Sequence, residues 1–204
     1  MRQIYVIRHG ETDWNHNHLF QGQTDIPLNE NGRWQASQLT EKLKPVLPFD
    51  RIVSSDLSRA VETATILSKG YTTPILTDPG LREVDFGEWE GLTADAIQRR
   101  WPGELQKWFS TGQLHAPGGE DFDAFYDRVW RCFQNWASKK DYQTMAVISH
   151  GGACRVLMCA ILERPIREMN GYILANTEAL LVHVDENDKY SIAPATETEG
   201  GGPS

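Results

Sequence analysis

The stretch that decides the fold is Val6-Ile7-Arg8-His9-Gly10, and it has a counterpart much later in the chain, Val147-Ile148-Ser149-His150-Gly151. In both, an apolar run leads directly into a polar residue, a histidine and a glycine. Such a run, ended by glycine, is typical of a buried strand and the turn after it. Ligands of open α/β sheets bind outside the carboxyl ends of the strands, so two such strands bring both histidines to one edge. A lone histidine there is usually structural, but the matched pair indicates a shared site.

The rest of the chain alternates short apolar runs with longer amphipathic ones. We expect strands at residues 4–7, 51–53, 74–76, 145–148 and 179–184, and helices at residues 29–44, 54–68, 93–100, 104–110, 121–138 and 152–162. This alternation predicts an α/β domain whose largely parallel sheet is covered on both faces. In the first helix, Asn29 is the expected N-cap, and Trp34 and Leu39 are expected on one packed side. The cluster Ser54-Ser55-Asp56 is expected to cap the second helix.

The length of 204 residues is typical of one domain, which we place at residues 1–195. Residues 81–120 are rich in glycine, tryptophan and charge, and are interpreted as an elaboration over one end of the sheet, above the active site. Residues 196–204 are polar and glycine-rich, and are expected to be a disordered tail.

Charge and composition exclude several kinds of partner. The formal net charge of -8 leaves no broad basic surface for a nucleic acid or an anionic membrane. The first apolar run stops at Arg8, too early for a signal peptide, and no run is long enough to span a bilayer. The three cysteines have no C-x-x-C spacing and suggest neither disulfides nor a zinc site. We therefore expect a cytoplasmic protein.

Two arginines are candidates for binding an anion at the edge with the histidines. Arg8 directly precedes His9, and Arg59 lies in the first turn of the helix after the second predicted strand. A helix N-terminus favours anions, and an arginine there opposes the helix dipole, a local cost that a bound phosphate would offset. Each guanidinium can donate paired hydrogen bonds to phosphate oxygens. With one histidine as nucleophile and the other as donor, this set suits phosphoryl transfer.

Phosphoryl transfer also needs a proton donor for the leaving oxygen. Glu83, in the segment after the third predicted strand, lies at a suitable distance along the chain. Asp85, Glu88 and Glu90 crowd the same segment, so spacing alone does not choose among the four.

At this point the sequence resembles the histidine phosphatase superfamily, also called the phosphoglycerate mutase-like or RHG family. Four segments in the right order carry the resemblance, which runs from residue 4 to about residue 184. They are Arg8-His9-Gly10-Glu11-Thr12 with Trp14-Asn15, Ser54-Ser55-Asp56-Leu57-Ser58-Arg59-Ala60 with Glu62-Thr63-Ala64, Leu81-Arg82-Glu83 with Phe86-Gly87-Glu88-Trp89-Glu90-Gly91, and Ser149-His150-Gly151-Gly152.

The resemblance implies a three-layer α/β/α sandwich and a role for each matching residue. His9 would be the phosphorylated nucleophile, and Glu83 the general acid that later activates water. Arg8, Arg59 and His150 would complete the phosphate pocket. Further phosphate or substrate contacts are implied at Asn15, Gln21, Gly22 and Gly151.

The predicted activity is metal-independent hydrolysis of a small-molecule phosphate ester, with no cofactor. His16-Asn17-His18 is interpreted as a solvated loop rather than a metal site.

Phosphoglycerate mutase-type transfer is the first alternative function. Gly22 is followed by Gln23-Thr24-Asp25 rather than by Gly-Trp, and the compact chain resembles broad-specificity and α-ribazole phosphate phosphatases. A non-catalytic phospho-ligand binding module is the second alternative. The natural substrate and the oligomeric state are left open.

Two features of the middle segment have alternative interpretations. Trp89, Trp101, Trp108 and Phe109 are expected mainly in packing; any that line the site would favour an ester with an apolar or aromatic body. The turn at residues 117–121 is expected to lead into the long helix, with a backbone N–H near the substrate as its alternative role.

Overall fold

The computed structural model describes residues 1–111 and 116–193, and the predicted tail at residues 196–204 lies outside them. A single sheet contains β1 (Arg2–Arg8), β2 (Arg51–Ser54), β3 (Ile75–Thr77), β4 (Thr144–Ser149), β5 (Ala179–Val184) and β6 (Tyr190–Ile192). Its strand order is β3-β2-β4-β1-β5-β6. The strands β3, β2, β4 and β1 are parallel, β5 pairs antiparallel with β1, and β6 pairs antiparallel with β5. The mostly parallel sheet is confirmed, and β6 is a short edge strand that the sequence pattern missed.

The two strands that carry the matching motifs are neighbours in perfect register. Val6 pairs with Val147, and Arg8 pairs with Ser149. His9 and His150, the next residue of each strand, therefore leave the sheet side by side at its carboxyl edge.

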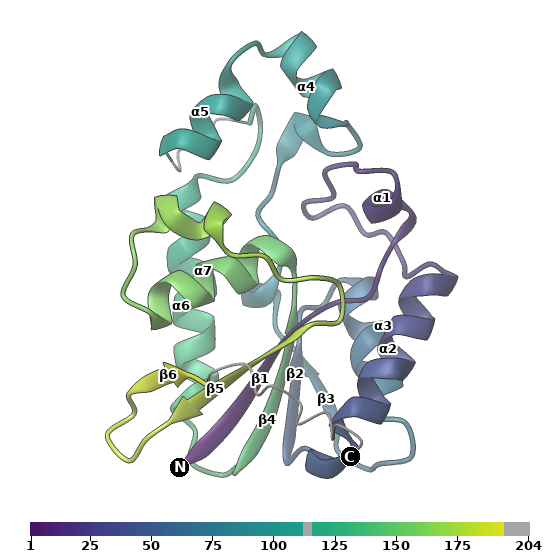
Figure 1. Ribbon diagram of the computed structural model, residues 1–204, viewed down its shortest axis with the longest axis vertical. Coiled ribbons are helices and arrows are strands. Elements are labelled where there is room, and N and C mark those ends of the chain that lie inside the picture. Colours follow the sequence, from purple (N-terminus) through teal and green to yellow (C-terminus); the bar gives the residue numbers. More distant parts are fainter. Residues whose placement is uncertain (112–115, 194–204) are drawn as a thin grey trace, which may run out of the picture.

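Helices cover both faces of the sheet, which confirms the three-layer α/β/α fold (Figure 1). Along β1, Ile4 and Val6 pack into one apolar cluster with α6 (Phe122–Ala137) and α7 (Gly151–Ile161). The alternate residues Tyr5 and Ile7 pack on the opposite face with α2 (Glu30–Leu43) and α3 (Ser58–Leu67). This alternation follows from the two-residue period of a strand.

The α2 helix begins as predicted but turns a different side inward. The Asn29 side chain accepts a hydrogen bond from the Gly32 N–H at 2.8 Å, which makes it the N-cap. Trp34, expected on the packed side, is 61% exposed. The reason is a close approach of backbones: a Cβ added to Gly10 would lie 2.5 Å from the Gly32 carbonyl oxygen. Small residues and Leu39 face inward, and the indole points outward.

The α3 helix lacks the N-terminal cap that the sequence predicted for it. It begins at Ser58 after Leu57 with no side-chain cap of its own, although the distant Asp25 carboxylate accepts from the Ser58 N–H at 2.7 Å. Ser55 and Asp56 are engaged elsewhere, with His150 and Arg82. The polar cluster before the helix therefore serves long-range contacts rather than the helix end.

The shorter elements lie mainly around the carboxyl edge of the sheet. They are α1 (Asp13–His16), α4 (Ala94–Arg100), α5 (Glu104–Thr111) and the 3-10 helices η1 (Lys44–Val46), η2 (Pro79–Leu81), η3 (Gly87–Trp89) and η4 (Ile166–Gly171). Figure 1 shows α4 and α5 rising beyond the strands at the top of the molecule.

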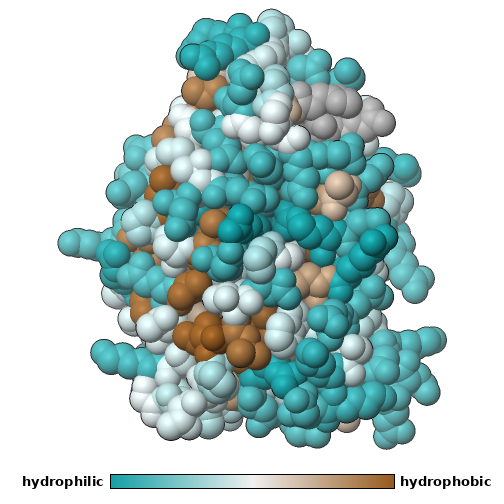
Figure 2. Space-filling view, turned by 180° about the vertical axis from the view of Figure 1, so that it is seen from behind, coloured by the Kyte–Doolittle hydropathy of each residue, from teal (hydrophilic) through white to brown (hydrophobic). Residues whose placement is uncertain are grey.

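One face of the molecule and the described helices bear on whether the chain could span a membrane. Seen from behind, it is mostly hydrophilic, with hydrophobic residues gathered in one area of the lower half (Figure 2). Within the described ranges, none of the helices has the length and apolarity needed to cross a bilayer. The cytoplasmic location stays a prediction.

Candidate active site

A cavity of about 440 Å³ opens at the carboxyl edge of the sheet, where β1 and β4 end. All of the predicted site residues except His150 line it: Arg8, His9, Asn15, Gln21, Gly22, Arg59, Glu83 and Gly151. His150 is fully buried, with its ring centroid 5.1 Å from that of His9. The fold therefore brings together residues from five separate parts of the chain.

The ring of His9 has a defined tautomer. Its Nδ1 lies 2.7 Å from the carbonyl oxygen of Gly10, the next residue. Because a carbonyl oxygen only accepts, Nδ1 carries the proton and Nε2 keeps its lone pair. Among the described residues, Nε2 has no hydrogen-bond partner, and it is not sealed from the cavity. The free nitrogen is thus available to attack an electrophile.

His150 is held in the opposite tautomer. Its Nδ1 accepts a hydrogen bond of 3.2 Å from Nε of Arg59, which can only donate. The proton therefore resides on Nε2, which donates to Oγ of Ser55 at 2.8 Å. These two contacts fix the ring from both sides.

Burial favours the neutral form of both histidines. Burial lowers the pKa of His9 and of His150 well below the usual value, and the charge of Arg59 adds to the effect. A neutral His9 is what a nucleophile requires, since an imidazolium has no lone pair to offer.

Arg59 is 1% exposed and anchors the loop that follows α1. Its Nη2 donates to the Gly22 carbonyl at 2.7 Å, and its Nη1 donates to the Thr24 carbonyl at 2.8 Å. Burial lowers its pKa to about 10, so the group stays charged at neutral pH. Each Nη keeps a second N–H for a ligand.

Arg8 has an unsatisfied donor at the floor of the cavity. Its Nη1 donates to the Leu174 carbonyl at 2.7 Å, while its buried Nε finds no acceptor in the described part of the chain. Gly151, the first residue of α7, packs against this guanidinium. A Cβ added to Gly151 would lie 3.4 Å from Cζ of Arg8. A buried donor without a partner is costly, and an anion in the cavity would satisfy it.

The structure separates Glu83 from the three other acidic candidates. Its carboxylate accepts from the N–H of Val84 at 3.0 Å and from the N–H of Gly152, in the first turn of α7, at 2.8 Å. Glu90 instead accepts from the backbone of residues 23 and 24, Asp85 accepts from Gly87, and Glu88 is exposed. Only Glu83 of the four lines the cavity.

The sequence is similar to a known protein family along most of its length. The model of the histidine phosphatase superfamily (branch 1) matches residues 4–193. The chain belongs to this superfamily. It is 36% identical to phosphoglycerate mutase-like protein 4 of Arabidopsis thaliana, over 93% of this chain and 83% of that protein. The predicted family and enzyme class, a histidine phosphatase, are confirmed.

Solved structures of this superfamily share the fold closely. YhfR of Bacillus stearothermophilus superimposes with a TM-score of 0.87 at 30% identity, over 95% of this chain and 96% of that one. The α-ribazole phosphatase of Shigella flexneri gives a TM-score of 0.84 at 26% identity, over 94% of each chain.

Like other parts of this histidine phosphatase site, Asn15 and Gln21 are tied into the protein. The Oδ1 of Asn15 accepts from the N–H of Thr12 at 3.2 Å, and the Oε1 of Gln21 accepts from the Thr12 hydroxyl at 2.8 Å. Both residues line the cavity, and their bonds to Thr12 hold the side chains in place.

Three polar residues of the site were not predicted from the sequence. Asn176 lines the cavity and donates from Nδ2 to the His9 carbonyl at 2.9 Å. Ser55 holds His150, and Arg155 of α7 also lines the cavity. Arg155 could have been found from its spacing, four residues after Gly151 on one helix face. Asn176 lies in the loop before β5 and carries no local signal. His18, expected to be solvated, is exposed at the cavity rim.

The outer wall of the cavity is aromatic. It consists of Phe20, Phe86, Trp108, Phe122 and Phe125, together with Met169 of η4. Phe86 lies between Phe20 and Trp108, with ring centroids 5.0 and 5.4 Å away. Of the four aromatic residues considered from the sequence, only Trp108 lines the cavity; Trp89 is fully buried beneath it and Phe109 is half exposed.

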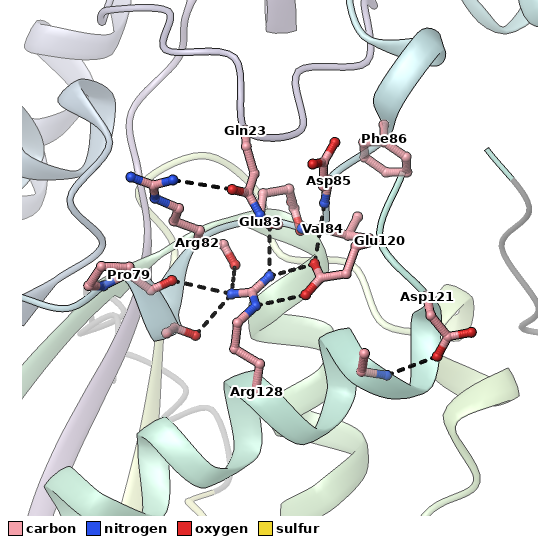
Figure 3. A network of polar contacts seen from close by, with 12 residues as sticks. Gln23, Pro79, Arg82, Glu83, Val84, Asp85, Phe86, Glu120, Asp121 and Arg128 are labelled. Atoms are coloured by element: carbon pink, nitrogen blue, oxygen red, sulfur yellow. Dashed lines mark hydrogen bonds and ion pairs between the residues drawn. The ribbon is translucent and has the colours of Figure 1, made fainter. Parts of the chain in front are cut away.

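An arginine of α6 holds the backbone that carries Glu83 (Figure 3). Arg128 donates to the carbonyls of Gly80 at 3.1 Å, Arg82 at 3.0 Å and Glu83 at 3.1 Å. Its charge is paired with Glu120 through bonds of 2.9 and 2.7 Å. The turn at residues 117–121 thus leads into α6, with Asp121 as N-cap, and also supplies the partner of this arginine.

Proposed function

We propose that this chain is a metal-independent phosphatase that hydrolyses a small phosphate monoester through a phosphohistidine on His9. The observation that carries the proposal is the His9 tautomer. Its Nδ1 proton is held by the Gly10 carbonyl, and Nε2 is left free in a cavity that Arg8 and Arg59 also line.

In the first step, Nε2 of His9 attacks phosphorus and the bond to the leaving oxygen breaks. Protonated Glu83 gives its proton to that oxygen, so an alcohol departs. Arg8 and Arg59 donate to the phosphoryl oxygens, where negative charge is concentrated. His150 could donate to a phosphoryl oxygen only if its Nδ1 took up a proton and released the hydrogen bond from Arg59.

In the second step, the Glu83 carboxylate removes a proton from water. The water oxygen attacks the phosphohistidine, the N–P bond breaks, and inorganic phosphate leaves. His9 regains its lone pair and Glu83 is again protonated, so the cycle is balanced without a metal or a cofactor.

The aromatic wall supports a substrate with an apolar or aromatic body next to the phosphate. Phe20 and Phe86 offer only apolar ring faces and edges, and the single N–H of the three rings, Nε1 of Trp108, is buried with no acceptor among the described residues. A sugar would leave its hydroxyl groups without partners there, at a cost of about 1–3 kcal/mol for each one buried.

Transfer of the phosphoryl group to a second substrate is the competing function. The similarity to a protein named phosphoglycerate mutase-like protein 4 supports this competing function. The two reactions differ only in what attacks the phosphohistidine, a substrate hydroxyl or water.

The experiment is turnover of p-nitrophenyl phosphate by the whole protein with a chelator present. We expect phosphate release, and full dependence on added metal would contradict the mechanism. His9→Ala should abolish turnover while the protein stays folded. Release of phosphate without interconversion of 2- and 3-phosphoglycerate would exclude the mutase, and folded wild-type protein that binds phosphate without turnover would point to a binding module.

A further inference from the structure

Arg155 is a cation inside the cavity to which the proposed reaction assigns no role. It lines the cavity together with Phe125 and Met169. Its Nε is shielded from solvent and has no acceptor, and the described residues form neither a hydrogen bond nor an ion pair with its side chain. A guanidinium so placed lacks the partner that such groups normally find.

The position of Arg155 on α7 directs it toward the reactants. It follows Gly151 by four residues, so the two lie on one side of the helix, about 6 Å apart along its axis. Long side chains on a helix lean toward its N-terminus, and the first two residues of α7 are glycines without side chains in the way.

The charge of Arg155 also acts on the phosphate pocket. Burial lowers the pKa of the Arg8 guanidinium, Glu83 opposes this, and the positive charge of Arg155 adds to the lowering. Two guanidinium groups within electrostatic reach in one cavity repel each other, and negative charge on a ligand would relieve that repulsion.

We propose that Arg155 binds a second anionic group of the substrate, a carboxylate or a second phosphate, apart from the phosphoryl group that is transferred. This inference rests on the proposed phosphatase function. The substrate then has its reactive phosphate between Arg8 and Arg59, an apolar body against the aromatic wall, and a second negative charge beside α7.

The alternative role for Arg155 is a third contact to the transferred phosphoryl group. The two roles differ in what the arginine distinguishes. A second-anion site separates substrates that carry an extra negative charge from neutral analogues, whereas a phosphoryl contact affects every phosphate ester alike.

The test uses two matched pairs of substrates with the full-length protein. The first pair is 4-carboxyphenyl phosphate and 4-nitrophenyl phosphate, whose carboxylate and nitro groups have the same shape. The second pair is 3-phosphoglycerate and glycerol 3-phosphate. For Arg155→Gln, we expect kcat/KM for the carboxylate-bearing substrate of at least one pair to fall by roughly 10- to 100-fold. This is the range for a lost charge-assisted hydrogen bond. The neutral partner should change by less than about threefold.

Two further variants make the result specific. Arg155→Lys keeps the charge and should restore part of the lost discrimination. Arg131→Gln removes an exposed arginine of α6 and should leave both members of each pair unchanged. Equal losses on both members, or no loss on either carboxylate, would overturn the inference. Absence of any turnover in the wild-type protein would instead overturn the proposed function.

Discussion

Replacing Gly152 by alanine should displace the proposed general acid without disturbing the fold. A Cβ at this position would lie 3.1 Å from Cδ of Glu83 and closer still to Oε1. Carbon atoms in contact prefer about 3.5–4.0 Å, so the carboxyl group must withdraw by roughly 0.5–1 Å. The group that has to move is the end of a flexible side chain, not backbone, so the helix itself can stay in place.

The expected effect on catalysis follows from this displacement. A shift of about 1 Å can reduce a rate roughly 100-fold, and general acid catalysis is worth about 10²–10⁴-fold. We therefore expect Gly152→Ala to lower kcat about 100-fold on an alkyl phosphate such as glycerol 3-phosphate. On p-nitrophenyl phosphate, whose leaving group needs little protonation, the loss should stay below about tenfold. Thermal stability should change little, because the helix preference of alanine over glycine, about 1 kcal/mol, offsets much of the weakened hydrogen bond from the Gly152 N–H to Glu83.

The assay is steady-state kinetics on both esters, with thermal melting of each variant. Gly171→Ala is the matched control, since a Cβ there meets no atom within 4 Å. Glu83→Gln should show the same dependence on the leaving group, and adding Gly152→Ala to it should have little further effect, since both changes remove one function.

Equal loss on the two esters would refute this reasoning, because it would mean that Gly152 acts on the phosphoryl group rather than through Glu83. Full multiplicative loss in the double variant would refute it as well.

Three further predictions concern other parts of the site. Arg128→Gln should slow hydrolysis of glycerol 3-phosphate about tenfold more than hydrolysis of p-nitrophenyl phosphate and should lower the melting temperature, because several carbonyls lose a charged donor. Replacing the exposed Arg131 by glutamine should have neither effect. Since the pKa values of His9 and His150 are lowered in the folded state, the unfolded chain binds more protons below about pH 6.5, so stability to urea should fall as the pH is lowered through this range, by up to about 3 kcal/mol per pH unit; a His150→Asn variant with an unchanged slope would contradict this. Trp108→Ala should raise KM for aryl phosphates several-fold relative to glycerol 3-phosphate, and equal KM changes would argue against the aromatic wall as a substrate contact.

The pair of histidines was predictable from sequence because strand geometry links local pattern to position. Two strands with the same pattern of side chains pair in register, and the residue after each strand then falls at the same edge. The order of strands and helices likewise follows from hydrophobic periodicity, which depends on near neighbours in the chain.

Other parts depend on contacts between distant segments, which periodicity does not report. Glu83 differs from Glu90 in its distant contacts, since one carboxylate meets α7 and the other holds the loop after α1. Trp34 lies outside because two backbones approach closely, and a helical pattern cannot show which side faces such a contact. Asn176 enters the site from a loop that no motif marks.

The first turn of α7 explains why these distant groups meet where they do. Gly151 leaves room for the guanidinium of Arg8, and Gly152 brings its N–H within 2.8 Å of the Glu83 carboxylate. A side chain at position 152 would occupy the space of the Glu83 carboxyl group, whereas a Cβ at position 151 would only touch the guanidinium of Arg8, at 3.4 Å. The glycines also expose the N-terminal backbone of the helix, which favours negative charge. The histidine of the second motif therefore contributes one part of the site, and Gly152, two residues later, determines whether the Glu83 carboxyl group can take its place there.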